Sequence, residues 1–166
     1  MVHKTVICEF KRVSMSNRQY FSSILEEARL WQQQQGSEGW DYPFDDEWLL
    51  PRIRRNELWL GLDGDQPVAA FRVLMEDVPF WGEREKGNSI YLHSFAVSRK
   101  VAGQGIGNDV ISFVRDMGQK QQRQFIRLDC SASSERLIHW YEKQGFYFVD
   151  TVIFNRKKML LMEMLC

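Results

Sequence analysis

A glycine-rich turn constrains the fold of this 166-residue chain more than any other feature. The turn reads Ala102-Gly103-Gln104-Gly105-Ile106-Gly107-Asn108. It lies between an apolar run at 90–97 and a stretch, 103–119, whose apolar residues recur at helical spacing. Glycine permits a sharp turn and a close ligand, and the first turn of a helix carries unpartnered amides and partial positive charge. The segment therefore predicts a strand–turn–helix unit that suits a phosphate or pyrophosphate.

Two known phosphate-binding motifs fit this turn incompletely. A P-loop needs a Lys after its last glycine, and no Lys follows Gly107. The dinucleotide-binding pattern fits in part, because Gly103 and Gly105 match its first glycines and Asp129 ends the next expected strand. However, Asn108 stands where its last glycine belongs, and the turn follows earlier helices and a hairpin. A dinucleotide-binding oxidoreductase stays open as an alternative, as does a turn whose glycines serve packing alone.

Hydrophobic periodicity in the rest of the chain predicts strands mixed with helices. Ser16 or Asn17 is placed to cap the first helix, Gly36 to end it, and Asp63-Gly64-Asp65 indicates a hairpin. Strands are expected at 6–10, 58–62, 68–74, 90–97, 125–129, 146–154 and 158–165, helices at 17–31, 45–55, 103–119 and 133–144, and a charged loop at 82–88. The order β-α-α-β-β-β-α-β-α-β-β predicts an α/β (α+β) fold with a mixed sheet. No linker or repeat is visible, so we expect one domain over residues 1–166.

Composition argues against several functional classes. The chain has 22 Lys and Arg residues against 22 Asp and Glu residues, which argues against a nucleic-acid partner. Its three cysteines form no C-x-x-C pair, and no spaced ligand cluster is evident, so we expect neither disulfides nor a bound metal. No signal peptide or membrane-spanning run is visible. We expect a cytoplasmic monomer or homodimer with no membrane partner.

Three motifs in order carry a resemblance to a known family. They are Phe95-Ala96-Val97, the glycine turn, and Trp140-Tyr141-Glu142-Lys143-Gln144-Gly145-Phe146 about 35 residues later. With Leu128-Asp129-Cys130 on the strand between them, the chain resembles the GNAT superfamily of acyl-CoA-dependent N-acyltransferases, in particular a bacterial subgroup of mostly unassigned substrate. The resemblance covers nearly the whole chain. It implies the GNAT-like fold, in which two central strands splay apart.

The resemblance implies a site for acetyl-CoA between the strands at 90–97 and 125–129. The pantetheine would pair with the backbone of Phe95 and Val97, and the pyrophosphate would rest on the amides of the glycine turn. The implied cofactor-binding residues are Phe95, Ala96, Val97, Ala102, Gly103, Gln104, Gly105, Ile106, Gly107, Asn108 and Ser134. Tyr141 matches the tyrosine that protonates the departing CoA thiolate in this family, and an ordinary tyrosine pKa of about 10 suits that role. A packed core tyrosine is the alternative.

Two residues depart from the family pattern. Ala102 stands where Arg or Gln is usual, so we expect weaker contact with the phosphates, for which Arg99 or Lys100 could compensate. Ser134 stands where Asn is common, although Ser can still cap the last helix. These departures keep open a second interpretation, a non-catalytic acyl-CoA-binding or sensor module.

His93 is the candidate base that would take a proton from the acceptor amine. An ordinary histidine pKa of about 6.5 lets the imidazole accept a proton at neutral pH. The resemblance supports the position, because arylalkylamine N-acetyltransferases carry a histidine at the corresponding place. The alternative is a structural His93, with Glu76 or Asp77 acting as the base through water. Cys130 is expected to fill the core rather than to act as a nucleophile.

The segment at 39–47, between the first two helices, is rich in aromatic and acidic residues. In the family this segment roofs the acceptor site, and aromatic faces and carboxylates attract cations. We therefore predict that Trp40 and Asp45 bind the substrate; the alternative is that the acids cap the next helix over packed aromatic rings. The resulting expectation is an N-acetyltransferase that moves an acetyl group from acetyl-CoA to a small-molecule primary amine by direct attack in a ternary complex. A protein N-terminus or lysine is the alternative acceptor.

Overall fold

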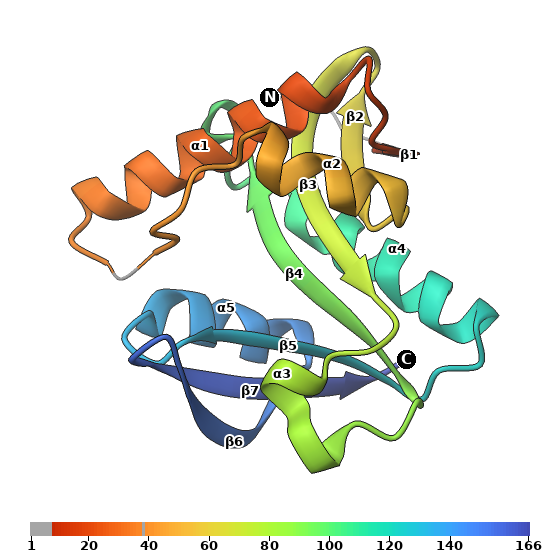
Figure 1. Ribbon diagram of the computed structural model, residues 1–166, viewed down its shortest axis with the longest axis vertical. Helices are drawn as coiled ribbons and strands as arrows, with labels where there is room; N and C mark the ends of the chain where they lie inside the picture. The colour runs from red at the N-terminus through yellow and green to blue at the C-terminus, as the bar shows by residue number, and fades with distance from the viewer. Residues whose placement is uncertain (1–7, 38) are drawn as a thin grey trace.

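Seven strands form one mixed sheet in the computed structural model, which describes residues 8–37 and 39–166 (Figure 1). In sheet order they are β1 (Glu9–Arg12), β2 (Leu58–Asp63), β3 (Gln66–Leu74), β4 (Ser89–Val97), β5 (Phe125–Ser131), β7 (Lys157–Leu165) and β6 (Tyr147–Phe154). β4 and β5 run parallel, and the other neighbours run antiparallel. This confirms the predicted mixed sheet. The expected first strand is β1; Val6 lies outside the described residues.

Helices cover both faces of the sheet (Figure 1). They are α1 (Arg18–Gln34), α2 (Asp46–Arg54), α3 (Val78–Trp81), α4 (Ile106–Lys120) and α5 (Glu135–Gln144). Phe21 of α1 and Leu49 of α2 are buried in a core on one face, whereas Val114 of α4 and Tyr141 of α5 belong to the core on the other. Burying an apolar side chain of this size contributes about 1.5–3 kcal/mol. The two helical layers therefore hold the sheet between them.

The short helix α3 lies at 78–81, where no element was expected, and a 3-10 turn at Gly82–Arg84 begins the expected loop at 82–88. Trp81 at the end of α3 is buried against Tyr91 of β4 and Leu161 of β7. One buried aromatic anchor organises this segment, and a single anchor leaves no periodic pattern in the sequence. The sequence analysis therefore missed α3, which matters because α3 borders the candidate site.

Two predicted helix caps are wrong in detail. Asn17 and Ser134 occupy the N-cap positions of α1 and α5, but neither side chain accepts a hydrogen bond from its helix. Oδ1 of Asn17 instead accepts from the amide of Ser14 at 2.7 Å and closes the preceding turn. Gly36 and Gly145 follow their helices with positive φ angles, which confirms the predicted helix ends.

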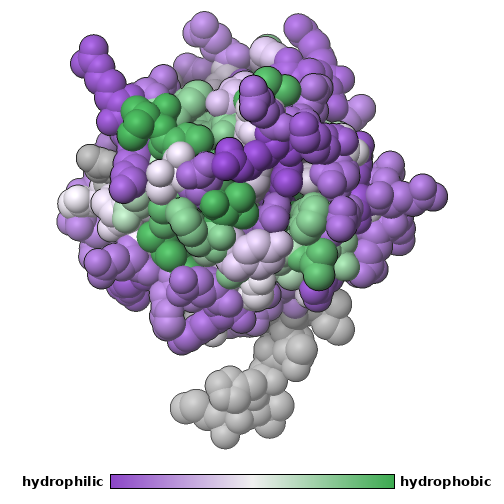
Figure 2. Space-filling model, turned by 90° about the horizontal axis from the view of Figure 1, so that it is seen from below, coloured by the Kyte–Doolittle hydropathy of each residue, from purple (hydrophilic) through white to green (hydrophobic). Residues whose placement is uncertain are grey.

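The end of the molecule formed by α3 and β6 carries scattered apolar side chains. Figure 2 views this end from below Figure 1 and shows separate apolar areas among hydrophilic ones. The large exposed apolar side chains of these two elements are Val78, Tyr147, Phe148, Ile153 and Phe154. Dispersed apolar side chains are normal on protein surfaces. Within residues 8–37 and 39–166, no helix is long and apolar enough to cross a bilayer.

The parallel pairing between β4 and β5 is short. It joins Ser89–Tyr91 to Phe125–Arg127, after which the two strands diverge (Figure 1). β4 stays paired with β3 as far as Val97, and β5 stays paired with β7 as far as Ser131. We call this divergence the β4–β5 split. It confirms the splayed central strands implied by the resemblance.

Candidate active site at the β4–β5 split

A β-bulge in β4 decides which side chains face the split. Ser94 has a φ of 46°, and the register between β3 and β4 shifts beside it. The extra residue changes the alternation of faces along the strand. Leu92 and Phe95 consequently both pack against the core beneath α4, whereas Ala96 packs against the core beneath α1. The backbone of the predicted cofactor-binding residues 95–97 lies along the split, on the edge that β5 has left.

The glycine turn connects the end of β4 to α4, and its backbone is suited to an anion. Gly103 and Gly105 have φ angles of 79° and 85°, and a Cβ added to either would meet nothing within 4 Å. Within the described ranges, the residues whose amides donate to no backbone carbonyl include Gly103, Gly105, Ile106 and Gly107. Ala102, Gln104 and Asn108 instead donate to carbonyl groups in or beside the turn, at 3.0–3.4 Å. Free amides at a helix N-terminus without side chains in the way fit the phosphates of CoA.

The two departures from the family pattern lie just before α4 and at the start of α5. Ala102 is exposed and offers no cation to a phosphate. The Arg99 guanidinium lies 4.1 Å above the Trp31 ring of α1, which leaves Lys100 as the cation beside the turn. Ser134 bonds through its backbone amide to the preceding turn. Its predicted contact with the cofactor stays a prediction.

Gly107 has a packing role that the sequence pattern does not reveal. A Cβ at this position would stand 2.7 Å from Cζ2 and 3.1 Å from Cη2 of the Trp140 indole. The same indole lies near the Phe95 ring, with 6.2 Å between the ring centroids. Trp140 therefore connects the first turn of α4 with β4 and α5 at the split.

Three titratable side chains meet at the split, on the face of the sheet that lies away from α4. Nε2 of His93 lies 2.9 Å from Oδ2 of Asp77, at hydrogen-bond distance, and Nδ1 lies 3.4 Å from Oδ1 of Asp129. Asp77 precedes α3, His93 is on β4 and Asp129 is on β5. His93 and Asp129 alternate with Leu92 and Leu128, which lie in the core beneath α4. These three residues, which we call the Asp–His–Asp cluster, therefore face away from α4.

The cluster is also a set of groups that could ligate a metal, contrary to the sequence expectation. The candidate ligand atoms of Asp77, His93 and Asp129 all lie within 4.8 Å of one another. The fold assembles them from three distant segments, so no ligand spacing in the sequence could reveal them. The direct contact between His93 and Asp77 uses atoms that a metal would need, which favours proton transfer over metal binding.

Burial and charge act in opposite directions on this cluster. Burial favours a lower pKa for His93, but the hydrogen bond with Asp77 and the charges of Asp129 and Asp77 outweigh it, so the pKa is raised despite the opposing charge of Arg72. Burial raises the pKa of Asp129 to about 6, against the attraction of His93. A histidine whose pKa is raised by paired carboxylates, beside a carboxyl group whose pKa is raised by burial, is an arrangement that suits acid–base chemistry.

Tyr141 is buried on the α5 side of the sheet. Its side chain packs edge-on against Trp140 and Phe146, with ring centroids 5.2 and 5.5 Å apart, and is only 6% exposed. Burial raises the pKa of Tyr141, which keeps its hydroxyl protonated as a proton donor requires. Its catalytic role stays a prediction. Burial raises the pKa of Cys130 to about 12, so this thiol is a poor nucleophile.

The predicted acceptor loop is packed and capped in the structure. Asp45 is the N-cap of α2, and its Oδ1 accepts from the amide of Trp48 at 3.1 Å. Trp40 packs edge-on against Phe44, with ring centroids 5.3 Å apart. This is the arrangement named above as the alternative. Substrate binding by Trp40 and Asp45 stays a prediction.

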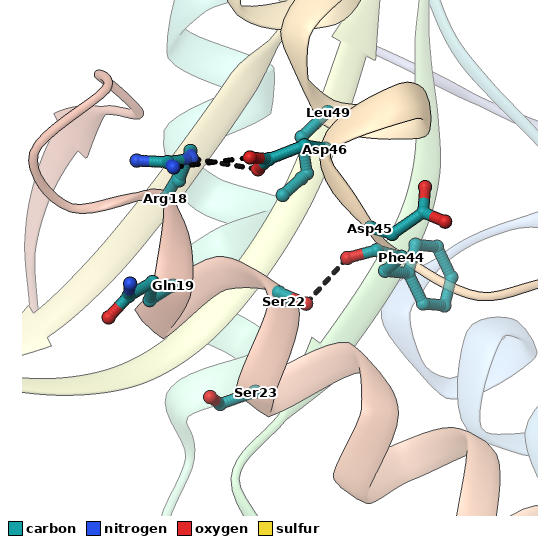
Figure 3. A pocket seen from close by; sticks show the side chains of 8 residues that line it. All are labelled: Arg18, Gln19, Ser22, Ser23, Phe44, Asp45, Asp46 and Leu49. Carbon is teal, nitrogen blue, oxygen red and sulfur yellow. Dashed lines mark hydrogen bonds and ion pairs between the residues drawn. The ribbon is translucent and has the colours of Figure 1, made fainter.

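A hollow of about 320 Å³ lies between α1 and α2 (Figure 3). It is lined by Arg18, Gln19, Ser22, Ser23, Phe44, Asp45, Asp46 and Leu49. Asp46 pairs with Arg18 at 2.8 and 3.2 Å, and the Ser22 hydroxyl donates to the Phe44 carbonyl. Much of its polar lining is thus already paired within the protein. The Asp–His–Asp cluster does not line this hollow, so we place the chemistry at the split.

Lys157 ties the acceptor loop to the turn between β6 and β7. Its Nζ donates to the carbonyl of Gly39 at 2.9 Å and pairs with Oδ2 of Asp41 at 3.3 Å. The hydrogen bond joins residues 118 positions apart in the sequence. The loop is therefore held in place by the far end of the chain.

The structure joins two of the candidate bases and adds residues that sequence reasoning missed. Asp77 bonds to His93 directly, and Glu76 is exposed. Asp129 and Phe80, whose ring centroid is 5.7 Å from that of His93, were not assigned to the acceptor side. Strand alternation would have placed Asp129 beside His93 had the register been known. No sequence signal marks Phe80.

Known proteins resemble this chain in sequence. The Acetyltransferase (GNAT) family matches residues 23–146. YesJ, an uncharacterized N-acetyltransferase of Bacillus subtilis (strain 168), is 37% identical over 90 residues, which are 51% of this chain and 50% of that protein. The match thus spans about half the length of this curated relative.

Solved structures show the same fold over nearly the whole chain. A GNAT-family acetyltransferase from Listeria monocytogenes superimposes with a TM-score of 0.79 and 23% identity, covering 96% of this chain and 95% of that one. An Arabidopsis thaliana protein in complex with the bisubstrate analogue CoA-Ac-MVNAL has a TM-score of 0.66 and 19% identity, covering 94% and 97%. The family match spans most of the chain, and on that ground this protein belongs to the GNAT family of acetyltransferases.

Proposed function

We propose that the protein transfers an acetyl group from acetyl-CoA to the primary amine of a small molecule, by direct attack in a ternary complex. The observation that carries the proposal is the β4–β5 split. Free amides lie in the turn that follows β4, an imidazole–carboxylate pair lies on one face and a buried tyrosine lies on the other. Membership of the GNAT family supports acetyl transfer.

The residues of the glycine turn and β4 would hold acetyl-CoA. The amides of Gly103, Gly105, Ile106 and Gly107 would donate to its pyrophosphate, and the free edge of β4 would pair with its pantetheine. When bound, the cofactor supplies the thioester carbonyl that is attacked. The Arabidopsis neighbour, which was solved with a CoA-based analogue, supports this assignment.

The protein's own groups would move the protons. His93, kept basic by Asp77, takes one proton from the acceptor ammonium, and the nitrogen lone pair then forms the C–N bond. As the C–S bond breaks, Tyr141 gives a proton to the sulfur. The second proton leaves the nitrogen and restores Tyr141, while His93 returns its proton to solvent. The products are an amide and free CoA.

The test is acetyl-CoA turnover by the purified protein with a panel of amines, followed by thiol release and by mass spectrometry of the acetylated product. We expect thermal stabilisation by acetyl-CoA but not by NAD, and thiol release only when a small amine is present. Stabilisation without thiol release for any acceptor would support a sensor module instead. Acetylation of peptide N-termini or lysines while small amines stay unmodified would move the acceptor class to proteins.

A further inference from the structure

One carboxylate oxygen of the Asp–His–Asp cluster lacks a partner. Oδ1 of Asp129 is buried and accepts no hydrogen bond from any residue that the structure describes. The side chain is only 9% exposed. Nδ1 of His93 lies 3.4 Å away but does not meet hydrogen-bond geometry. A buried carboxylate oxygen without a donor is unfavourable, so this oxygen points to a ligand that brings a donor.

Asp129 and His93 occupy equivalent positions on the two diverging strands. The last pair of the β4–β5 ladder is Tyr91 with Arg127, and each cluster residue lies two positions farther along its strand. Side chains two positions apart share a face of a sheet. A group that enters from the acceptor side therefore meets the imidazole and the carboxylate together, where the backbones no longer bond to each other.

The cluster carries an excess of negative charge. Asp77 and Asp129 face one imidazole, so two carboxylates against one imidazolium leave one negative charge even when His93 is protonated. Arg72 also acts on His93, but it is bonded to Glu57 at 2.8 Å. A single bound cation balances this charge, whereas an anion would increase the excess.

Aromatic rings border the cluster on the side of α3 and β6. The Phe80 ring lies 5.7 Å from that of His93 and stacks on Phe154, with ring centroids 4.3 Å apart. These rings offer an apolar surface to the body of a ligand whose charged end reaches the cluster.

An acceptor with a second ammonium group would need a second unpaired carboxylate close to Asp129. Oδ2 of Asp77 is already bonded to Nε2 of His93 at 2.9 Å, so Oδ1 of Asp129 is the buried oxygen of the cluster that lacks a donor. The arrangement therefore favours an acceptor with one ammonium group over a polyamine.

We propose that Asp129 receives the acceptor as a primary ammonium ion, and that this acceptor is a monoamine with an aromatic or apolar body. The inference rests on the proposed function, because the bound nitrogen is the one that is acetylated. Asp129 holds the ammonium through a charge-assisted hydrogen bond, and His93 removes one proton. The nitrogen then forms the C–N bond as the C–S bond breaks, with the remaining protons moving as described above. Asp129 thus determines specificity by contact with the substrate.

The test compares steady-state acetylation of 2-phenylethylamine by the wild type, Asp129→Asn and a matched control, Asp150→Asn. Asp150 is a carboxylate of β6 that pairs with Arg84 outside the cluster. We expect Asp129→Asn to raise KM for the amine roughly 10- to 100-fold, the loss typical of a hydrogen bond to a charged group. KM for acetyl-CoA should stay within about twofold, and Asp150→Asn should leave both constants unchanged.

A neutral analogue separates recognition of the ammonium from a structural role. The inhibition constant of 2-phenylethanol should change less than about twofold in Asp129→Asn, because the alcohol has no charge for the carboxylate to bind. Equal weakening of the alcohol and the amine would assign Asp129 to structure and overturn the proposal.

An unchanged KM for the amine would also overturn the proposal, and if the variant in addition lost Zn²⁺ binding, the cluster would be a metal site. Higher kcat/KM for spermidine than for 2-phenylethylamine would refute the monoamine class. Binding of CoA without acetylation of any amine by the wild type would contradict the proposed function itself.

Discussion

Replacing Gly107 by alanine tests whether the first turn of α4 is packed against the indole of Trp140. Gly107 is the second residue of α4, and alanine is the better helix former by at most about 1 kcal/mol. The added Cβ would stand 2.7 Å from Cζ2 of Trp140, well inside van der Waals contact. The indole must therefore move, and it lies beside Phe95 and Tyr141.

The two contributions oppose each other, and packing outweighs helix propensity. Overpacking of this kind typically costs about 1–3 kcal/mol. After subtraction of the helix-propensity gain, we expect Gly107→Ala to destabilise the protein by about 1 kcal/mol, or roughly 2–4 °C in Tm for a chain of this length. Because the amide of Gly107 is one of the free donors in the turn, KM for acetyl-CoA should rise as well.

The assay is reversible chemical or thermal unfolding of Gly107→Ala in two backgrounds, the wild type and Trp140→Leu. With the indole removed, the clash is gone, and Gly107→Ala should then raise the free energy of unfolding. A stabilising effect in the wild-type background, or the same destabilisation in both backgrounds, would refute the contact with Trp140.

The remaining predictions concern the turn, the acid and the base. Gly105→Ala has room for its Cβ but strains a φ of 85°; it should cost about 1–2 kcal/mol of stability and weaken CoA binding in calorimetry. Gly64→Ala in the β2–β3 hairpin, at a φ of 59°, carries similar strain, and equal CoA affinities of the two variants would exclude the turn as the phosphate site. Tyr141→Phe should lower kcat by roughly 100-fold or more at unchanged KM for acetyl-CoA, and an unaltered kcat would assign Tyr141 to the core. His93 acts as a base only when neutral, so its raised pKa sets the acid limb of kcat/KM; Asp77→Asn should lower that pKa and move the limb to lower pH, and a limb that stays in place would exclude the pairing.

Local sequence patterns predict the order of the strands and helices and the site of the glycine turn. Periodic apolar residues mark each long helix, and positive φ angles at Gly103 and Gly105 confirm that these positions need glycine. The splayed strands came from the resemblance alone. The sequences of the strands at 90–97 and 125–129 do not indicate where their pairing stops, because both continue with an apolar residue, Leu92 or Leu128, directly after the last pair.

The Asp–His–Asp cluster could not be predicted, because it depends on long-range register. Asp77 reaches His93 only because Trp81 anchors α3 beside β4, and one aromatic residue in a charged segment carries no periodic signal. The β-bulge at Ser94 likewise changes which residues share a face. Asp45 illustrates the opposite difficulty. Its acidic side chain and its position in the loop at 39–47 suggested a substrate-binding residue, whereas in the structure its carboxylate caps α2.

The short pairing between β4 and β5 has a mechanical consequence. These two strands are paired at only three positions, so we expect the sheet to separate most easily at the β4–β5 split. The hydrogen bond and ion pair of Lys157 with Gly39 and Asp41 also connect the two sides of the split. A ligand lying along the free edge of β4 would supply backbone hydrogen-bond partners in the position that an additional strand would occupy. Ligand binding at the split should therefore make the whole sheet more rigid than it is in the free protein.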